Sequence, residues 1–271
     1  MRSVHRIAFQ NLLFITINFL WIILIDNNKI YGNTMYETFD KHWSYLTPHV
    51  FTFNIWKVIS LLLVLTAIMY CIILQREEEE NCLLAEQLDR SGNWMLINQL
   101  FLGLSMVLKL NEHLALAFIC SLATYYSLNK LNYMFKISES RNPAFIHILT
   151  RTSLGIYSGW FTYTLGYNGI PLINTVLHTE PNHTILFYAS ILYLIPSFCY
   201  IMYKSIICRL PAVLIGYTSG VLGAYYYNLS HVLDRSYSVY MHYTLLVILT
   251  VATATIIYLL IQKGKDLFLT D

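Results

Sequence analysis

The sequence predicts an all-α, polytopic transmembrane helical bundle with about eight spans. Of its 271 residues, 56% are hydrophobic and only 12% are charged, whereas a soluble domain averages about 25% charged residues. The mean hydropathy is +0.52. Long apolar runs alternate with short connectors that hold most of the charges, as expected for a chain that crosses a hydrocarbon layer of about 30 Å repeatedly. The chain is therefore expected to be an integral, multi-pass membrane protein.

Each predicted span is a mostly apolar run of a length that suits a bilayer, about 17–25 residues. The third run is short, and residues 111–113 leave only a tight hairpin between it and the fourth. The first run lacks a small-residue cleavage site, so we interpret it as a retained span. The eight runs are Ile7–Ile25, Val50–Leu74, Trp94–Leu110, Leu114–Phe135, Thr152–Ile173, Thr184–Tyr203, Leu210–Asn228 and Tyr240–Gln262.

The distribution of lysine and arginine supports the eight-span count. Positive charges concentrate on the cytosolic side of membrane proteins. The N-terminus, the connectors after the second, fourth and sixth spans, and the C-terminus hold twelve such residues, against four on the opposite side. Both termini are therefore expected on the cytosolic or matrix side. The twelve are Arg2, Arg6, Arg76, Arg90, Lys130, Lys136, Arg141, Arg151, Lys204, Arg209, Lys263 and Lys265, and the four are Lys29, Lys41, Lys109 and Arg235.

The sequence offers no group that we interpret as catalytic or metal-binding. No Asp or Glu lies in the middle of a span, which argues against a proton-coupled pump because such transporters use intramembrane carboxylates. Nucleophile-elbow, phosphate-loop and zinc-protease motifs are missing, and no basic aromatic patch suggests nucleic acid. The five cysteines and nine histidines are interpreted as core and interfacial residues. We therefore predict a protein that is not an enzyme and holds no metal.

Small residues recur in the seventh span at a spacing that favours close helix contact. Gly216, Gly220 and Ala224 stand four residues apart, with Gly223 alongside. Such a row lets a second helix approach closely. We expect these residues to form a helix-packing surface, with a partner helix in this chain favoured over one in a neighbouring subunit.

The stretch LTPHVFTFNIWKVI (46–59) has the features of a helix that enters a membrane. Pro48 suits a first helical turn because proline lacks an N–H group. Phe51 and Trp56 are aromatic anchors of the kind found near lipid headgroups. Lys57 lies only two turns inside, from where its side chain can reach the interface. These features alone require no ligand.

Two stretches carry a resemblance to a known family. Residues 46–59 are similar to the pattern FTPxxYTFxIWxxIY, and the fifth span holds Tyr157, Gly159, Trp160 and Asn168 in a matching order. Over about residues 7–175 the chain thereby resembles the translocator-protein family (TspO/MBR, the tryptophan-rich sensory proteins), in particular its longer members. The resemblance implies a five-helix membrane core in residues 1–175 and three additional transmembrane helices packed on it in residues 176–271.

The resemblance also implies a pocket for a tetrapyrrole or a sterol. Two departures weaken that implication, because Gly103 stands where the family has Asn and Met106 where it has Trp. They remove a hydrogen-bonding group and a stacking surface, each worth on the order of 1 kcal/mol. The residues that would line this pocket are Trp43, Pro48, Phe51, Trp56, Tyr157, Trp160 and Asn168.

Two functions from different classes are open at this point. The first is an accessory or structural subunit of a larger membrane complex, in contact with lipids and other membrane subunits. A respiratory complex of the mitochondrial inner membrane is the setting that we favour. The alternative is TspO-like binding or transport of a lipophilic ligand, with a tetrapyrrole as the possible cofactor. A passive transporter or an enzyme of unrecognised type is a third possibility.

Overall fold

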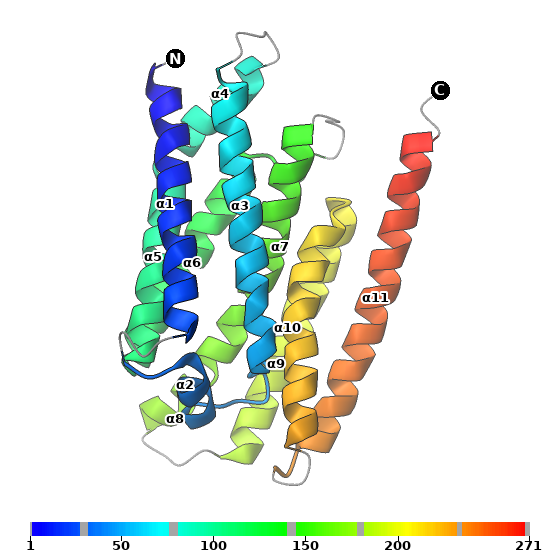
Figure 1. Ribbon diagram of the computed structural model, residues 1–271. Helices are drawn as coiled ribbons and strands as arrows, with labels where there is room; N and C mark the ends of the chain where they lie inside the picture. The colour runs from blue at the N-terminus through cyan, green and yellow to red at the C-terminus, as the bar shows by residue number, and fades with distance from the viewer. Residues whose placement is uncertain are drawn as a thin grey trace. The chain divides into compact units, whose positions relative to one another are not determined.

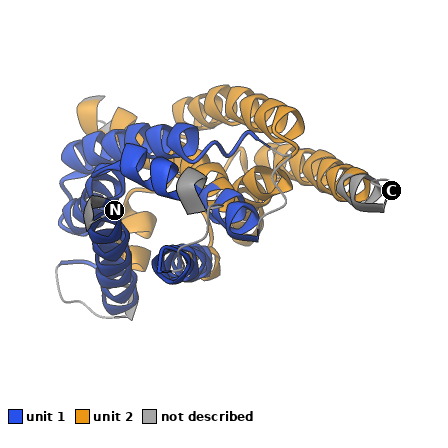
Figure 2. Ribbon diagram, turned by 90° about the horizontal axis from the view of Figure 1, so that it is seen from above, with its two compact units in different colours: residues 1–34, 54–154 blue, residues 35–53, 155–271 orange. Residues whose placement is uncertain are grey.

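The structure is a computed structural model that describes residues 2–27, 32–75, 81–139, 145–177, 182–231 and 235–268. These residues are mostly helical and contain no strand, which confirms the all-α prediction. Contacts between residues divide the chain into two compact units (Figure 2). Unit 1 consists of residues 1–34 and 54–154, and unit 2 consists of residues 35–53 and 155–271.

Unit 1 is built around four long helices and one short one. In it, α1 packs against both α3 and α5, and α5 packs along the length of α6 (Figure 1). The short α4 contacts α1 and α6. The helices are α1 (Arg2–Asn27), α3 (Asn54–Ile73), α4 (Asn81–Ser91), α5 (Trp94–Leu110) and α6 (Leu114–Met134).

One face of α1 is directed into unit 1. Its buried side chains follow one another at intervals of three or four residues: Ala8, Asn11, Ile15, Asn18 and Ile22. This spacing places them on a single helix face. Two of the five are asparagines, which are costly in a hydrocarbon layer unless they face the protein interior. This face of α1 therefore places the amides of Asn11 and Asn18 in the interior of unit 1.

Unit 2 contains the three C-terminal long helices and three short ones. There α10 packs against α9 and α11, and the 3₁₀ turn η1 contacts α10. The elements are α2 (Met35–Lys41), η1 (Val50–Phe53), α8 (Leu172–Leu177), α9 (His183–Ile207), α10 (Pro211–Ser230) and α11 (Ser238–Phe268). The remaining long helix, α7 (Phe145–Gly169), belongs to unit 1 up to Leu154 and to unit 2 from Gly155 onward.

Each predicted span lies mostly in helical residues, but some of these helices are too short or too polar to be recognised as spans on their own. Five segments are long and apolar enough: Val4–Ile25, Val50–Ile73, Leu114–Met134, His183–Ile207 and Ser238–Gln262. A sixth is obtained if α4 and α5, bent by 50° at their junction, count as one broken span. The chain is thus a multi-pass membrane protein, and the number eight and the shared side of the termini stay predictions.

The helices α7 and α10 miss this criterion because they carry many polar or small residues. In α10, 12 of the 20 residues are buried, and in α7 the polar residues Thr150, Arg151 and Ser153 are buried. Side chains that face other helices rather than lipid need not be apolar. A count of spans from length and composition alone can therefore miss helices that are surrounded by other helices.

The fifth predicted span is shifted along the chain. It was expected at residues 152–173, whereas α7 begins at Phe145 and ends at Gly169. The helix ends before Pro171, since a proline disfavours helical geometry in the residue before it. The helix also starts earlier than expected, because the apolar pattern excluded the polar residue Arg151. In the structure Arg151 is buried and donates through Nε to the carbonyl of Ile137 at 2.7 Å.

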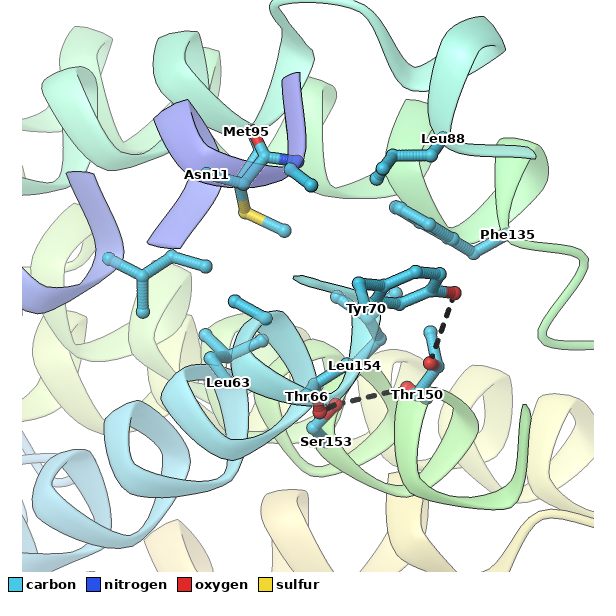
Figure 3. A pocket seen from close by; sticks show the side chains of 13 residues that line it. Asn11, Leu63, Thr66, Tyr70, Leu88, Met95, Phe135, Thr150, Ser153 and Leu154 are labelled. Atoms are coloured by element: carbon cyan, nitrogen blue, oxygen red, sulfur yellow. Dashed lines mark hydrogen bonds between the residues drawn. The ribbon is translucent and has the colours of Figure 1, made fainter. Parts of the chain in front are cut away.

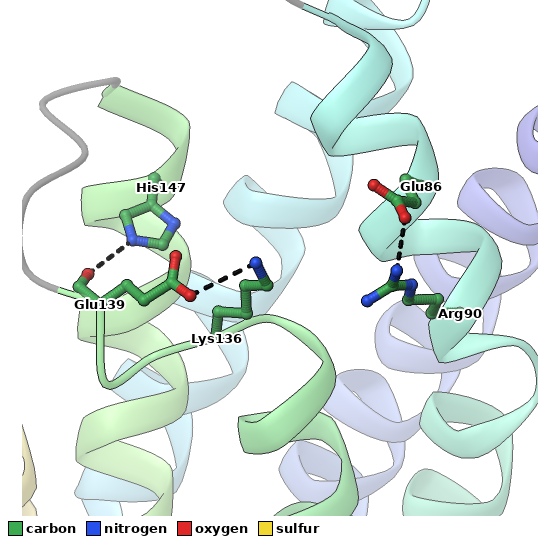
Figure 4. A network of polar contacts seen from close by, with 5 residues as sticks. All are labelled: Glu86, Arg90, Lys136, Glu139 and His147. Carbon is green, nitrogen blue, oxygen red and sulfur yellow. Dashed lines mark hydrogen bonds and ion pairs between the residues drawn. The ribbon is translucent and has the colours of Figure 1, made fainter.

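Charged contacts occur at the end of unit 1 where α6 ends and α7 begins (Figure 4). Lys136 Nζ lies 3.3 Å from a carboxylate oxygen of Glu139, and His147 Nε2 lies 2.9 Å from the Glu139 carbonyl oxygen. On α4, Arg90 pairs with Glu86 one turn away. All of these pairs are local in sequence, and exposed pairs of this kind contribute only about 0–1 kcal/mol each.

Candidate functional site

The connector 42–53, which contains the proline motif, is anchored to unit 2 through its backbone. Tyr163 donates its hydroxyl to the carbonyl of Leu46 at 2.5 Å, and Asn228 Nδ2 donates to the carbonyl of Tyr45 at 2.8 Å. The amide of His49 donates to the carbonyl of Gly223 at 3.0 Å. A buried backbone group without a partner costs about 1–3 kcal/mol. These three bonds therefore fix the non-helical part of the connector, before η1, in the interior of unit 2.

The side chain of Tyr45 continues this anchoring. Its oxygen accepts a hydrogen bond from the Tyr237 amide at 3.3 Å and lies 3.2 Å from Nδ1 of His183. Burial raises the pKa of Tyr45, an effect that the hydrogen bond from the Tyr237 amide and the charge of Arg235 partly offset. The hydroxyl consequently stays protonated at neutral pH.

Trp43, in the same connector, makes a cation–π contact with Arg235. The guanidinium carbon of Arg235 lies 3.9 Å from the ring centre of Trp43 and 5.0 Å from that of Tyr227. Arg235 Nη2 also donates to the Tyr227 hydroxyl at 3.2 Å. Contacts of this kind contribute about 0.5–2 kcal/mol. The Trp43 ring is thus used to hold a cation of the protein itself.

The remaining predicted ligand-binding residues lie in different surroundings. Trp160 is fully buried and meets Phe53 and Tyr163 at ring-centre distances of 6.2 Å each. Phe51 is 45% exposed and touches the exposed ring of Tyr226 at 5.5 Å.

The others are divided between the two units. Pro48 and Tyr157 are buried in unit 2, Asn168 is half-buried there, and Trp56 is buried in unit 1. Within unit 2 the structure brings six of the seven predicted residues onto the connector 42–53 and α7.

The glycines of α10 lie where α7 approaches most closely. A Cβ atom on Gly216 would stand 2.0 Å from the carbonyl oxygen of Ile156, and one on Gly159 would stand 1.8 Å from that of Val213. A Cβ on Gly220 would overlap the ring of Tyr163. Ala224 is fully buried. The neighbours of Gly216 and Gly220 are thus supplied by this chain, and Gly159 of the tryptophan motif completes the contact.

A cavity lies elsewhere, inside unit 1 (Figure 3). Its volume is about 20 Å³, counted as the space that the centre of a water molecule can occupy. None of the seven predicted ligand-binding residues lines it. The lining residues are Ala8, Asn11, Ile15, Leu63, Thr66, Ala67, Tyr70, Leu88, Met95, Phe135, Thr150, Ser153 and Leu154.

A chain of buried amides crosses unit 1 from α1 to α6. Asn18 Nδ2 donates to Gln99 Oε1 at 2.8 Å, and Gln99 Nε2 donates to Asn98 Oδ1 at 3.1 Å. Asn98 Nδ2 then lies 3.0 Å from both the Thr124 carbonyl and Ser127 Oγ. Sequence reasoning considered only charged residues in the spans and missed this chain. Asn11 and Asn18, seven residues apart in an apolar run, were the available signal.

The amide chain gives a structural reason for Gly103. A Cβ atom at this position would lie 3.3 Å from Asn18 Oδ1 and 3.9 Å from Trp21. The glycine thus leaves room for the side chain of Asn18. An amide supplied by α1 therefore lies beside the α5 position where the resemblance led us to expect an asparagine.

Replacing Gln99 with leucine is expected to destabilise unit 1. The substitution removes the acceptor of Asn18 and leaves a buried amide without that bond, at a cost of about 1–3 kcal/mol. The melting temperature of the purified protein in mild detergent measures the effect. Asn129→Leu is the control, since Asn129 is half-buried and donates to the carbonyl of Tyr125 in its own helix at 3.0 Å. Equal melting temperatures for Gln99→Leu and Asn129→Leu would contradict the prediction.

The fold and these interior contacts define an α-helical, multi-pass membrane protein in which buried polar side chains form hydrogen bonds between helices. A family model described as TSPO-like protein matches residues 7–215. The chain belongs to the TSPO-like protein family. Comparisons with curated proteins and with solved structures gave no match.

The family match extends beyond the predicted core boundary at residue 175. It includes all of α9 and the first residues of α10. The compact units divide the chain at other positions, within α7 and on either side of residues 35–53. A separate five-helix core at residues 1–175 therefore stays a prediction.

Proposed function

We propose that this TSPO-like protein is a non-enzymatic accessory subunit of a larger membrane complex, in which its scaffold packs against lipids and other subunits. The observation that carries the proposal is that two of the residues predicted to line a ligand pocket pack against protein groups instead. Trp43 holds Arg235, and Trp160 is enclosed by Phe53 and Tyr163. A ring in such contacts offers little surface to a ligand. These positions therefore act in holding unit 2 together.

The dimensions of the cavity in unit 1 support the same proposal. The space of about 20 Å³ that a water centre can occupy is little more than the roughly 10–15 Å³ that one water requires. A tetrapyrrole or a sterol is many times larger. Binding either of them would require the surrounding helices to separate.

The surface of the C-terminal helices provides area for a neighbour. On α9, Leu192 and Tyr203 are exposed, and on α11, Val247 and Ile257 are exposed. In a membrane, helices associate through packing of such surfaces rather than through a hydrophobic driving force. We assign part of this area to another subunit, and we favour a respiratory complex of the mitochondrial inner membrane as the assembly.

Gentle extraction from the native membrane tests the proposal. We expect the protein to migrate in a native gel with at least one stoichiometric membrane partner, which mass spectrometry of the band identifies. We also expect it to fractionate with inner mitochondrial membranes. Recovery as a lone monomer under conditions that keep known complexes intact would contradict the subunit role, and fractionation with another membrane would contradict the location alone.

A protoporphyrin titration separates this proposal from lipophilic-ligand binding. We expect no saturable quenching of tryptophan fluorescence in the purified protein, because Trp43 and Trp160 are already covered by protein groups. Saturable quenching in the wild type that disappears in Trp160→Phe would favour the ligand-binding function instead. Trp94→Phe is the matched control, because Trp94 lies in unit 1 beside Tyr126 and outside the predicted set.

A further inference from the structure

Two lysines near helix ends lie against tyrosine rings and have no acidic partner. The Nζ atom of Lys130 lies 5.5 Å from the ring centre of Tyr126 in α6, and that of Lys204 lies 6.0 Å from the ring centre of Tyr200 in α9. Each lysine stands within four residues of the end of its helix. In the part of the chain that the structure describes, neither ammonium group forms an ion pair or a hydrogen bond with the protein.

These ammonium groups are not needed to cap their helices. At the end of α6, the amide of Ile137 donates to the carbonyl of Asn132 at 3.1 Å, and at the end of α9 the amide of Leu210 donates to the carbonyl of Ser205 at 2.9 Å. Backbone bonds of this kind satisfy carbonyls at the end of a helix without a side chain. Both lysines are therefore available to a negatively charged group outside the chain.

The surface beside each lysine has the character of a membrane interface. On α6, Ile119, Leu122 and Tyr126 are exposed at intervals of three and four residues, on the helix face that leads to Lys130. Trp94 of α5 lies 5.9 Å from Tyr126, and such rings are typical of headgroup depth. The exposed neighbours of the α9 lysine, one turn away on either side, are Tyr200 and Ile207.

The chemistry of these two faces fits a lipid phosphate. A lysine ammonium is a compact charge with three donors, and a phosphate diester supplies the negative charge that is missing. The acyl chains of the same molecule would cover the apolar side chains that precede the lysine. The distribution of lysine and arginine assigns both lysines to the cytosolic or matrix side, where anionic lipids attract basic residues.

We propose that the Tyr126–Lys130 face of α6 and the Tyr200–Lys204 face of α9 each bind the headgroup of one anionic phospholipid, with the ammonium group on the phosphate. The proposal deepens the contact with lipids named above, and it depends neither on the subunit role nor on the mitochondrial location. A lone monomer that binds both lipids would therefore contradict the subunit role alone.

Lipid binding to the full-length protein tests the proposal. The purified protein in a non-ionic detergent receives either phosphatidylglycerol, which is anionic, or phosphatidylcholine, which has no net charge, and native mass spectrometry counts the bound molecules. We expect two phosphatidylglycerol molecules to bind with an affinity about five-fold or more above that of phosphatidylcholine, as one added charge attraction at a membrane surface provides. Equal binding of the two lipids would overturn the proposal.

Charge removal separates the two sites. Lys130→Gln and Lys204→Gln should each weaken one of the two bound phosphatidylglycerol molecules about five-fold, whereas Lys130→Arg should keep both. Lys136→Gln is the matched control, because Lys136 follows α6 and is already paired with Glu139 at 3.3 Å (Figure 4). A glutamine variant that binds like the wild type would overturn the site of its lysine. An equal loss in Lys136→Gln would reveal a general effect of net charge and overturn both sites.

Inorganic phosphate distinguishes a lipid site from a general anion site. Because the acyl chains add apolar contacts that a free ion lacks, we expect phosphatidylglycerol to stay bound when millimolar inorganic phosphate is present. Displacement of the lipid by phosphate would overturn the assignment of these faces to a phospholipid.

Discussion

Replacing Gly216 with alanine is expected to destabilise unit 2 more than any other single methyl group that could be added to α10. The new Cβ would lie 2.0 Å from the carbonyl oxygen of Ile156 and 2.8 Å from the amide nitrogen of Trp160. Both are backbone atoms of α7, which cannot rotate away as a side chain can. Overpacking of this kind costs about 1–3 kcal/mol and occasionally more, and we expect a value at the upper end.

The expected loss of stability is opposite in sign to the usual effect of a glycine-to-alanine substitution in a helix. Glycine to alanine in a helix normally stabilises by about 0.5–1 kcal/mol, so a higher melting temperature for Gly216→Ala would contradict the close approach. Gly159→Ala is the reciprocal test from α7 and should lower the melting temperature similarly, since its Cβ would lie 1.8 Å from the Val213 carbonyl oxygen. Ile215→Ala, at an exposed position next to Gly216, is the control and should have a small effect.

Removing the two side chains that hold the connector 42–53 is the second prediction with a large effect. Tyr163→Phe leaves the Leu46 carbonyl without its donor, and Asn228→Leu does the same to the Tyr45 carbonyl. Each substitution should cost about 1–3 kcal/mol. Because both act on one short segment, the double variant should deviate from additivity by about 0.5 kcal/mol or more.

Hydrogen exchange locates this effect in the chain. The amide of His49, bonded to the Gly223 carbonyl at 3.0 Å, should be protected in the wild type and should exchange faster in both variants. Tyr133→Phe is a suitable control, since Tyr133 is 81% exposed. If the peptide covering the connector exchanges equally fast in the wild type and in Tyr163→Phe, the hydroxyl of Tyr163 does not anchor this segment.

The long helices were predictable because their pattern is local. The expected run Trp94–Leu110 coincides with α5, and the run Leu114–Phe135 differs from α6 by one residue. Apolar composition is sufficient for such segments. It fails at the start of α7, where the buried polar residue Arg151 interrupts the pattern, and it does not mark the short helix α2, whose sequence MYETFDK holds two carboxylates and a lysine.

The interior contacts were not predictable because they join residues far apart in sequence. Tyr163 and Leu46 are 117 positions apart, and Asn18 and Gln99 are 81 positions apart. No periodicity in the sequence relates such pairs. Family resemblance identified Trp43 and Trp160 as special, and the structure adds their surroundings: one holds Arg235 and the other lies among aromatic rings. A family motif draws attention to a position, and the contacts of that residue in the structure show what it does there.

The anchoring of the connector has a consequence for how the chain is made. Its partner Asn228 is 183 residues further along the chain, and a ribosome adds about 5–20 residues per second. Synthesis therefore delivers this partner roughly 10–40 s after Tyr45 has left the ribosome. During this interval the connector lacks its final acceptors and donors, so unit 2 completes only after α10 has been inserted. Nascent chains that stop before residue 228 should accordingly remain targets for quality-control proteases.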